Sequence, residues 1–253
     1  MNLSGKHALV TGGGSGIGAA IAFALARAGA GVTICGRRLE ELEFTAERHG
    51  NINWVTADVT DEASVGRLYD EAQAARGPFD IVVANAGAAE SAPAEKLTRE
   101  IWQKMIDVNL TGAFLSVRPA IAGMRAKKWG RIVFIASTAG LKGYAYVAPY
   151  VAAKHGVVGL SRALAIETAK AGITVNAVCP GFTETSLLDR AVDRIAERSK
   201  LDEMGARKLL EARNPQGRFM QPQEVADVVL WLCGEESAAI TGQAISVSGG
   251  ETW

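Results

Sequence analysis

The sequence predicts an α/β protein built on one doubly wound parallel sheet. Apolar runs of strand length alternate with segments of helical periodicity along nearly the whole chain, which favours parallel strands joined by right-handed helical crossovers. The first run passes directly into a glycine-rich turn and a helix, an order that begins many sheets of this kind. The expected strands cover residues 6–11, 31–35, 52–57, 80–84, 131–136, 173–178 and 244–247.

Composition narrows the class of protein. The 253 residues include 27 basic and 27 acidic side chains, so the formal net charge is zero and favours neither nucleic acid nor an anionic membrane as a partner. No apolar run approaches the roughly 20 residues of a membrane span, and no N-terminal targeting signal is visible. The three cysteines lack metal-ligand spacing, so we expect no metal site and interpret them as buried thiols of a cytoplasmic protein. We expect one domain over residues 1–253.

The stretch TGGGSGIG joins the first strand to the first helix. Glycines let a backbone approach a pyrophosphate closely, and the amide groups at a helix start attract an anion. A tight turn needs glycines as well, so the stretch alone is a weak signal, but its place between strand and helix favours a dinucleotide cofactor. We expect the cofactor to contact Gly12, Ser15, Gly16, Ile17 and Gly18.

The second strand ends at Gly36, Arg37 and Arg38, where a dinucleotide fold meets the adenosine ribose. An acidic residue there would bind the 2′-hydroxyl of NAD, but Gly36 occupies the position. The two guanidinium groups that follow suit a 2′-phosphate. The sequence therefore favours NADP(H). A solvated helix start is the other interpretation of Arg37 and Arg38, and the glycine-rich stretch carries no basic residue, so NAD(H) stays open as an alternative.

Two further strand ends carry candidates for the cofactor site. Asp58 and Val59 follow the third strand, where a carboxylate can bind the adenine amino group. Capping of the loop is the alternative for Asp58, and Asp61 is an equal candidate for the cap of the next helix. The fourth strand is followed by Asn85, Ala86 and Gly87.

Four residues near the middle of the chain form the candidate catalytic site. Tyr150 and Lys154 lie four positions apart, on one face of the expected helix. An ammonium group lowers the pKa of a neighbouring phenol, so Tyr150 can act as a general acid or base toward a carbonyl or alcohol. Ser137 ends a buried strand and can hold the same oxygen. Asn109 lies in a long helix expected over 98–127, where asparagine is unfavourable, and this indicates a function such as bridging a water to Lys154. Ordinary helix positions are the alternative for Asn109 and for the Tyr–Lys pair.

The sixth strand leads into a loop with further cofactor candidates and then into the region 186–214. The loop candidates are Pro180, Gly181, Thr183 and Thr185. Apolar residues recur at helical spacing from Leu187 to Ile195, so we expect an amphipathic helix that forms a mobile lid over the substrate. Arg190, Arg194 and Arg198 could bind the phosphates of a carrier thioester, although a solvated face of mixed charge is the simpler interpretation.

The chain resembles the short-chain dehydrogenase/reductase family over essentially its whole length. The resemblance rests on TGGGSGIG, NAG at 85–87, PGFTET at 180–185, and the four candidate catalytic residues. It implies a Rossmann-type sheet of about seven strands, a nicotinamide cofactor and a homotetramer. It also implies that Tyr150 is the acid/base, that Ser137 orients the substrate oxygen, and that Lys154 binds the nicotinamide ribose and lowers the pKa of Tyr150. Asn109 would hold a water that links Lys154 to solvent.

The same resemblance assigns parts of the cofactor site. Asp58 would face adenine and Thr185 would meet the nicotinamide carboxamide. Asn85 would shape the site or chiefly stabilise the sheet. The glycines that shape the site would be Gly12, Gly16 and Gly18.

Two subgroups of the family share longer runs with this chain. The run from Ala148 to Thr185 and the length of 186–214 are similar to ketoreductases of aromatic polyketide synthesis, which reduce β-keto acyl thioesters with NADPH. The run YVAAKHGVVG is also similar to 3-hydroxybutyrate dehydrogenases, which use NAD. We expect an NADP(H)-dependent oxidoreductase that interconverts a ketone and a secondary alcohol, with a β-ketoacyl thioester or related β-keto compound as substrate. The alternatives are an NAD-dependent 3-hydroxy acid or secondary-alcohol dehydrogenase and a non-catalytic cofactor-binding sensor.

Overall fold

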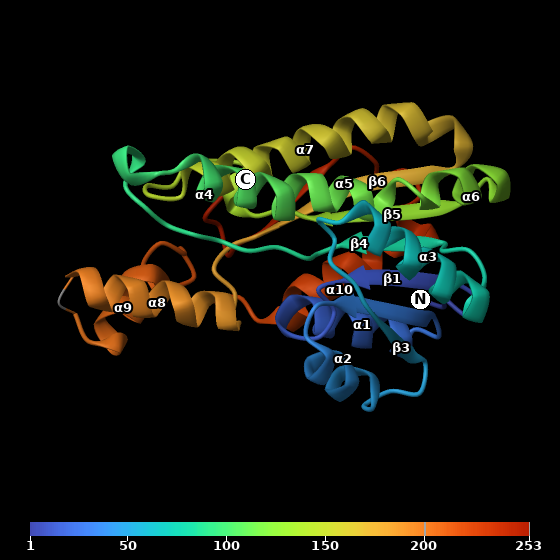
Figure 1. Cartoon of the computed structure of the whole chain (residues 1–253), viewed down its shortest axis with the longest axis horizontal. Coiled ribbons are helices and arrows are strands. Elements are labelled where there is room, and N and C mark those ends of the chain that lie inside the picture. The colour runs from blue at the N-terminus through green and yellow to red at the C-terminus, as the bar shows by residue number, and fades with distance from the viewer. Residues whose placement is uncertain (200, 253) are drawn as a thin grey trace.

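The computed structural model describes residues 1–199 and 201–252. Its seven strands form one parallel sheet in the order β3-β2-β1-β4-β5-β6-β7, which confirms the predicted doubly wound fold (Figure 1). The strands are β1 (His7–Thr11), β2 (Gly31–Gly36), β3 (Ile52–Thr56), β4 (Ile81–Ala84), β5 (Gly130–Ile135), β6 (Ile173–Pro180) and β7 (Ala244–Val247).

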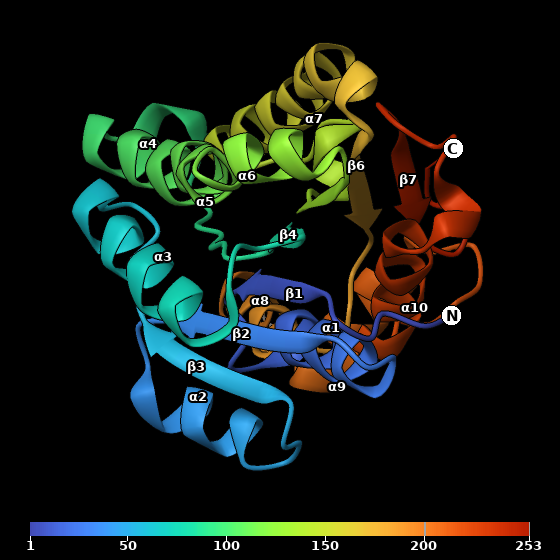
Figure 2. The same cartoon turned by 90° about the vertical axis from the view of Figure 1, so that its right-hand side faces the viewer.

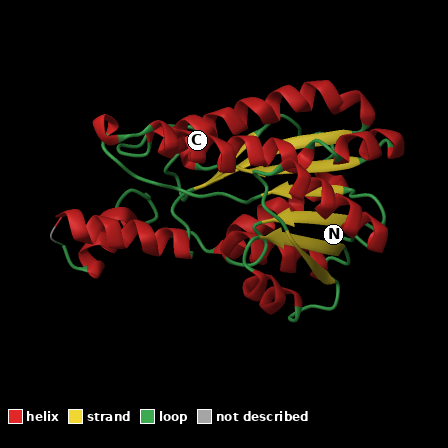
Figure 3. Ribbon diagram, viewed as in Figure 1, coloured by secondary structure: helices red, strands yellow, loops and turns green. Residues whose placement is uncertain are grey.

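Helices cover both faces of the sheet, as Figures 2 and 3 show. On one face, Ile21 of the first helix and Val225 of the last belong to one apolar core. On the other face, Leu68 and Val157 belong to a second core. The first layer comprises α1 (Gly16–Arg27), α2 (Leu39–Ala46) and α10 (Pro222–Cys233), and the second comprises α3 (Glu62–Arg76), α5 (Gly112–Val117), α6 (Ala120–Lys127) and α7 (Ala148–Thr168).

Strand β1 lies inside the sheet, because β2 pairs with it on one side and β4 on the other. The chain order reverses at this point. Open parallel sheets bind ligands beside such a reversal, at the carboxyl ends of the strands. The glycine-rich stretch follows β1 and Asn85 follows β4, so the fold brings both to this edge.

The single helix predicted over 98–127 is wrong. The structure has α4 (Arg99–Ile106), then a wider π-helical turn over Asp107–Thr111, then α5 and α6. Asn109 lies in the π-helical turn, a feature that is frequent at functional sites. Pro119 separates α5 from α6, because proline has no amide hydrogen for the helical ladder and so interrupts it.

The region 186–214 contains two helices, α8 (Ser186–Ser199) and α9 (Glu203–Glu211), which stand beyond the carboxyl edge of the sheet (Figure 1). The first confirms the helix expected from the apolar spacing. Leu188 and Val192 of α8 pack against Leu210 of α9 and Phe219 in a small core of their own. The side chain of Arg198 lies outside the described residues. The role of a lid stays a prediction.

Candidate active site

The glycine-rich loop after β1 is shaped by close backbone contacts. Gly12 and Gly16 have φ angles of +66° and +53°, a region that favours glycine. A Cβ atom on Gly18 would lie 2.2 Å from the carbonyl oxygen of Gly12, so no side chain fits there. The side-chain amide of Asn85 donates to the carbonyl oxygens of Thr11 (2.8 Å) and Gly12 (3.2 Å). Asn85 therefore braces the loop from the end of β4.

This loop fits the pyrophosphate of a dinucleotide. It leads into the N-terminus of α1, whose amide groups and dipole attract an anion. Within the part of the chain that the structure describes, the Ser15 side chain makes no capping bond to those amides. Thr185 lies beside the loop, because a Cβ on Gly16 would be 3.0 Å from its Cγ2 atom. Ile17 is partly buried against the core on the α1 face of the sheet, and its contact with the cofactor stays a prediction.

The two arginines after β2 are exposed but paired. Arg37 lies 3.7 Å from Asp58, and its side chain is 75% exposed. Arg38 pairs with Glu41 at 2.5 Å and donates to the Ser15 hydroxyl at 3.4 Å. Exposed ion pairs of this kind are weak, so an incoming phosphate can compete for both guanidinium groups. Sequence reasoning placed the arginines at this edge but missed Glu41 as a partner.

Asp58 and Asp61 have separate roles after β3. The Asp58 carboxylate accepts hydrogen bonds from the Thr60 amide at 2.9 Å and hydroxyl at 2.7 Å. The hydrogen bond from the Thr60 backbone amide has the largest effect and holds the pKa of Asp58 below its usual value. The charge of Arg37 makes a smaller contribution in the same direction. Asp61 caps α3 by accepting from the amide of Ala63. Val59, also predicted for the cofactor site, is buried against Gly112 on α5.

Lys154 is buried on α7 beside the end of β5, with 4% of its surface exposed. Its Nζ atom donates to the carbonyl oxygen of Ile135 at 2.8 Å and lies 5.6 Å from the centre of the Tyr150 ring. Burial lowers the pKa of Lys154 to about 8. A Cβ on Gly87 would lie 2.8 Å from Oδ1 of Asn109 and 3.7 Å from Lys154 Nζ. The fold thus brings Asn109 and Lys154 together beside the Cα atom of Gly87, where no side chain separates them.

Asn109 is fixed by hydrogen bonds to Ala88 and Met105. Its amide donates to the carbonyl oxygens of Ala88 and Met105, both at 2.9 Å, and its Oδ1 atom accepts from the amide of Ala88 at 3.2 Å. The side chain therefore ties the π-helical turn to the segment that follows β4. The water bridge from Asn109 to Lys154 stays a prediction.

Tyr150 differs from the expectation in one respect. Burial raises the pKa of its phenol, while a hydrogen bond with the Ser137 hydroxyl opposes the increase. The predicted lowering by Lys154 is therefore wrong for this structure. The physical reason is that burial disfavours the phenolate and the ammonium alike. The Ser137 hydroxyl also accepts from the Ala139 amide at 3.1 Å, so it faces the short turn that follows β5.

The loop after β6 lies along the same edge. Pro180 ends β6 opposite Val247, and the Gly181 amide donates to the Val247 carbonyl at 3.0 Å. The hydroxyl groups of Thr183 and Thr185 donate to the carbonyl oxygens two residues earlier, at 3.0 and 3.2 Å. These bonds fold the loop on itself and leave Thr185 next to the glycine-rich loop.

Two residues that sequence reasoning missed hold this edge together. The Thr11 hydroxyl accepts hydrogen bonds from the backbone amides of Asn85 and Ala86, both at 3.0 Å. Arg207 on α9 pairs with Glu184 at 2.6 Å and with Asp189 at 3.5 Å, so it fastens α9 to the start of α8. Thr11 directly precedes the first glycine of the loop, and this position is a local signal for its role. No local pattern indicates the partners of Arg207.

Residues 6–195 match the family described as short chain dehydrogenase. The chain belongs to this family. It is 43% identical over 250 residues to the "Granaticin polyketide synthase putative ketoacyl reductase 1" of Streptomyces violaceoruber, with 96% of this chain and 92% of that protein covered. It is 38% identical to a D-beta-hydroxybutyrate dehydrogenase of Cupriavidus necator, with 98% of each covered. A crystal structure of an actinorhodin polyketide ketoreductase variant with NADPH has a TM-score of 0.95 at 39% identity, over 99% of both chains.

This short chain dehydrogenase is therefore an NAD(P)-dependent oxidoreductase that interconverts a ketone and a secondary alcohol, as the sequence predicts. Among the described residues, none of the helices is both long enough and apolar enough to cross a membrane.

Proposed function

We propose that this enzyme reduces a β-keto acyl thioester, or a related β-keto compound, with NADPH. The observation that carries the proposal is the end of β2, where Gly36 stands in the position of a NAD-selecting acid and the exposed guanidinium groups of Arg37 and Arg38 follow. Similarity to ketoacyl reductases over nearly the whole chain supports the substrate class. When bound, the cofactor supplies hydride transfer at the nicotinamide.

Tyr150 is the proposed general acid. Because its pKa is raised, the phenol is protonated at neutral pH and can donate its proton to a ketone oxygen. The Ser137 hydroxyl would hydrogen-bond the same oxygen and stabilise the charge that develops on it. Lys154, with a pKa of about 8, can return a proton to Tyr150 near neutral pH. It would also hold the nicotinamide ribose. Asn109 would connect Lys154 to solvent through a water.

The proposed lid, residues 186–214, has contacts suited to that role. Arg194 of α8 donates to the carbonyl oxygen of Ala89 at 3.5 Å, so the helix reaches the segment that follows β4. The helices α8 and α9 share a core of their own, which allows them to move as one unit. Closure over a bound ketone would exclude water from the developing charge.

The second candidate is an NAD-dependent dehydrogenase of a 3-hydroxy acid. One specific observation favours it: Arg37 and Arg38 already have carboxylate partners in Asp58 and Glu41, which reduces their availability to a phosphate. The similarity to D-beta-hydroxybutyrate dehydrogenases supports this alternative as well.

The two candidates are separated by initial rates with NADPH and NADH against acetoacetyl-CoA, a simple β-keto ester, a bicyclic ketone and acetoacetate. We expect NADPH and the thioester to give the highest kcat/KM. Replacing both arginines (Arg37→Ala with Arg38→Ala) should reduce the preference for NADPH about tenfold or more, since a charge-assisted hydrogen bond contributes roughly 1.5–3 kcal/mol. A parent enzyme that prefers NADH and acetoacetate would establish the second candidate instead.

We also propose that the enzyme is a cytoplasmic homotetramer. Two large apolar side chains are exposed on the adjoining helices α4 and α7: Trp102 is 43% exposed and Ile166 is 85% exposed. Such positions suit an interface between copies of the chain. The buried free thiols of Cys35, Cys179 and Cys233 fit a reducing compartment. Light scattering gives the mass in solution, and the mass of a single chain would contradict the assembly.

A further inference from the structure

A buried carboxylate lies near the catalytic edge, outside the proposed mechanism. Glu251 follows β7, and its side chain is only 1% exposed. Its Oε1 atom accepts a hydrogen bond from the phenol of Tyr144 at 2.6 Å and lies 3.1 Å from Nζ of Lys142. The Lys142 ammonium also donates to the backbone carbonyl of Glu251 at 3.3 Å. A carboxylate so completely buried needs such partners, because burial without them is costly.

A second hydrogen bond of Tyr144 extends this group of residues toward Ser137. The phenol oxygen of Tyr144 lies 2.6 Å from the hydroxyl of Thr138. A phenol has one proton, and Tyr144 gives it to Glu251, so the Thr138 hydroxyl must be the donor in this second bond. The result is a directed chain of hydrogen bonds from Thr138 through Tyr144 to Glu251. Bonds in such a chain strengthen one another, and the last has an ionised acceptor.

Thr138 belongs to the turn that sets the Ser137 hydroxyl. Ser137 immediately precedes the short 3-10 turn Thr138–Gly140 and accepts from the Ala139 amide. The amide groups of Leu141 and Lys142 both donate to the Thr138 carbonyl, at 2.9 and 3.0 Å. A displacement of Thr138 would therefore move the turn and, with it, the serine.

The other side of the turn rests on the helix that carries the catalytic lysine. A Cβ on Gly140 would lie 2.8 Å from the backbone carbonyl oxygen of Lys154. The turn is thus held between α7 on one side and the Glu251 segment on the other. Tyr144 also meets the ring of Phe182 edge to face, with ring centres 6.3 Å apart, which connects the same group to the loop after β6.

The protonation of Tyr144 suits this arrangement. Burial raises the pKa of its phenol well above the ordinary value, and the hydrogen bond to Glu251 raises it further. The phenol therefore remains a hydrogen-bond donor over the range in which an enzyme of this class works.

We propose that Glu251 is a positioning residue for the reaction: through Tyr144 and Thr138 it fixes the turn that orients the Ser137 hydroxyl toward the substrate oxygen. This inference rests on the proposed role of Ser137. Lys142 supports Glu251 by balancing its charge. Because small displacements of a reacting group are costly in rate, the position of Ser137 should matter for kcat more than for cofactor binding.

The test replaces Glu251 with its neutral isostere, Glu251→Gln, in the parent and in a Ser137→Ala background, with the ketone that the parent reduces fastest. In the parent we expect kcat to fall about 10- to 100-fold, as for a displaced catalytic group, with KM for the cofactor unchanged. In the Ser137→Ala background the same substitution should change kcat by no more than about twofold, because there is no hydroxyl left to position. Glu235→Gln is the matched control, since Glu235 is also an ion-paired carboxylate but pairs with Arg131, at the opposite end of β5.

Tyr144→Phe provides a second variant if Glu251→Gln does not fold. It keeps the ring that meets Phe182, removes both hydrogen bonds, and should show the same dependence on Ser137. Equal losses of kcat in both backgrounds, or unchanged kcat in the parent, would overturn the positioning role. If Ser137→Ala alone retains full activity, the proposed function of Ser137 fails, and this outcome is distinguishable from the others.

Discussion

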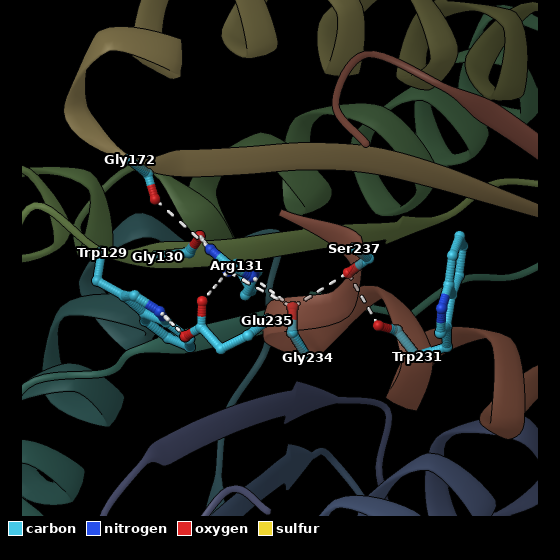
Figure 4. Close-up of polar contacts among 8 residues, drawn as sticks. All are labelled: Trp129, Gly130, Arg131, Gly172, Trp231, Gly234, Glu235 and Ser237. Carbon is cyan, nitrogen blue, oxygen red and sulfur yellow. Dashed lines mark hydrogen bonds and ion pairs between the residues drawn. The ribbon is translucent and has the colours of Figure 1, made fainter. Parts of the chain in front are cut away.

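Strand β5 has a buried cation near each end, and the two are surrounded differently. Arg131, near the start of the strand, is 2% exposed. Figure 4 shows its guanidinium group among carbonyl oxygens: it donates to Gly130 at 2.9 Å, to Gly172 at 3.5 Å and to Gly234 at 3.4 Å. The Glu235 carboxylate lies 3.5 Å from the guanidinium group and also accepts a hydrogen bond from the indole of Trp129. Arg131 is thus enclosed by partners.

At the other end of β5, the Lys154 ammonium donates to the Ile135 carbonyl, which is its single hydrogen bond within the described residues. An ammonium group has three protons to donate. Burial lowers the pKa of both cations, but that of the lysine reaches about 8, whereas a guanidinium group stays charged in any case.

The comparison distinguishes a structural cation from a functional one. Arg131 joins the ends of three segments and loses little by burial, because carbonyl oxygens replace its water. Lys154 lacks such compensation, so its charge is costly and its proton is labile near neutral pH. Groups with this property are the ones that take part in acid–base chemistry. We expect changes at the Lys154 end of β5 to affect turnover and to change stability in a way that depends on pH. Changes at the Arg131 end should affect stability alone, independently of pH.

The largest expected effect is at the Lys154 end. Tyr150→Phe keeps the ring and removes the phenolic proton, so kcat should fall by ~10²–10⁴-fold, the range of positioned acid–base groups. The melting temperature and the cofactor dissociation constant should stay near those of the parent. Steady-state kinetics and fluorescence titration measure both, and near-normal turnover would remove Tyr150 from its proposed role.

The second prediction concerns the stability cost of the Lys154 charge. Its pKa falls from the ordinary 10.5 to about 8 on folding, so the unfolded chain binds more protons between these values and stability rises with pH across that window. At pH 7 the charge of Lys154 lowers the free energy of unfolding by about 3 kcal/mol, at 1.36 kcal/mol per pKa unit. The hydrogen bond from Lys154 to Ile135 offsets about 1 kcal/mol of this loss.

Lys154→Met should therefore be more stable than the parent by about 2 kcal/mol at pH 7, and the gain should shrink as the pH rises from 8 toward 10. Urea denaturation at pH 7 and pH 9.5 tests this. A gain that does not change with pH, or a loss at pH 7, would mean that the lysine charge is compensated after all.

The smallest effect is expected at the opposite end. Arg131→Met should lower the free energy of unfolding by about 1–2 kcal/mol, because buried carbonyl oxygens lose a donor. The loss should be independent of pH between 7 and 9.5, since the guanidinium group does not titrate there, and kcat should be unchanged. Glu235→Gln is the control: its carboxylate is 73% exposed, so its loss should cost below about 1 kcal/mol. A fall in kcat for Arg131→Met would contradict the division between the two ends.

Much of the fold follows from local pattern. Strands buried on both faces read as continuous apolar runs, so β7 has the predicted limits of 244–247 and β2 extends only one residue beyond the prediction. Once the strands are parallel, their carboxyl ends share an edge, which is why Gly12, Asn85 and Ser137 could be placed together from sequence.

Other features depend on distances that the sequence does not display. The π-helical turn within residues 98–127 was missed because it keeps helical dihedral angles and has no residue signature of its own. The break between α5 and α6, in contrast, has a signal in the sequence, because it lies at Pro119. The direction of the Tyr150 pKa depends on burial rather than on spacing from Lys154. Arg131 was read as part of a buried strand, but its partners at 172 and 234 come from distant segments. Glu251 lies in a short polar segment with no periodicity.

The packing of α1 against α10 has a consequence for how the enzyme matures. Ile21 and Leu25 of α1 are fully buried in a core that α10 completes with Val225 and Val229. During synthesis the strands of the sheet cover these side chains only in part until α10 has emerged, and exposed apolar surface of this kind promotes aggregation. Contacts between such distant segments also form slowly. Since α1 begins at the glycine-rich loop, we expect a nascent chain to bind its dinucleotide tightly only after α10 has packed against α1.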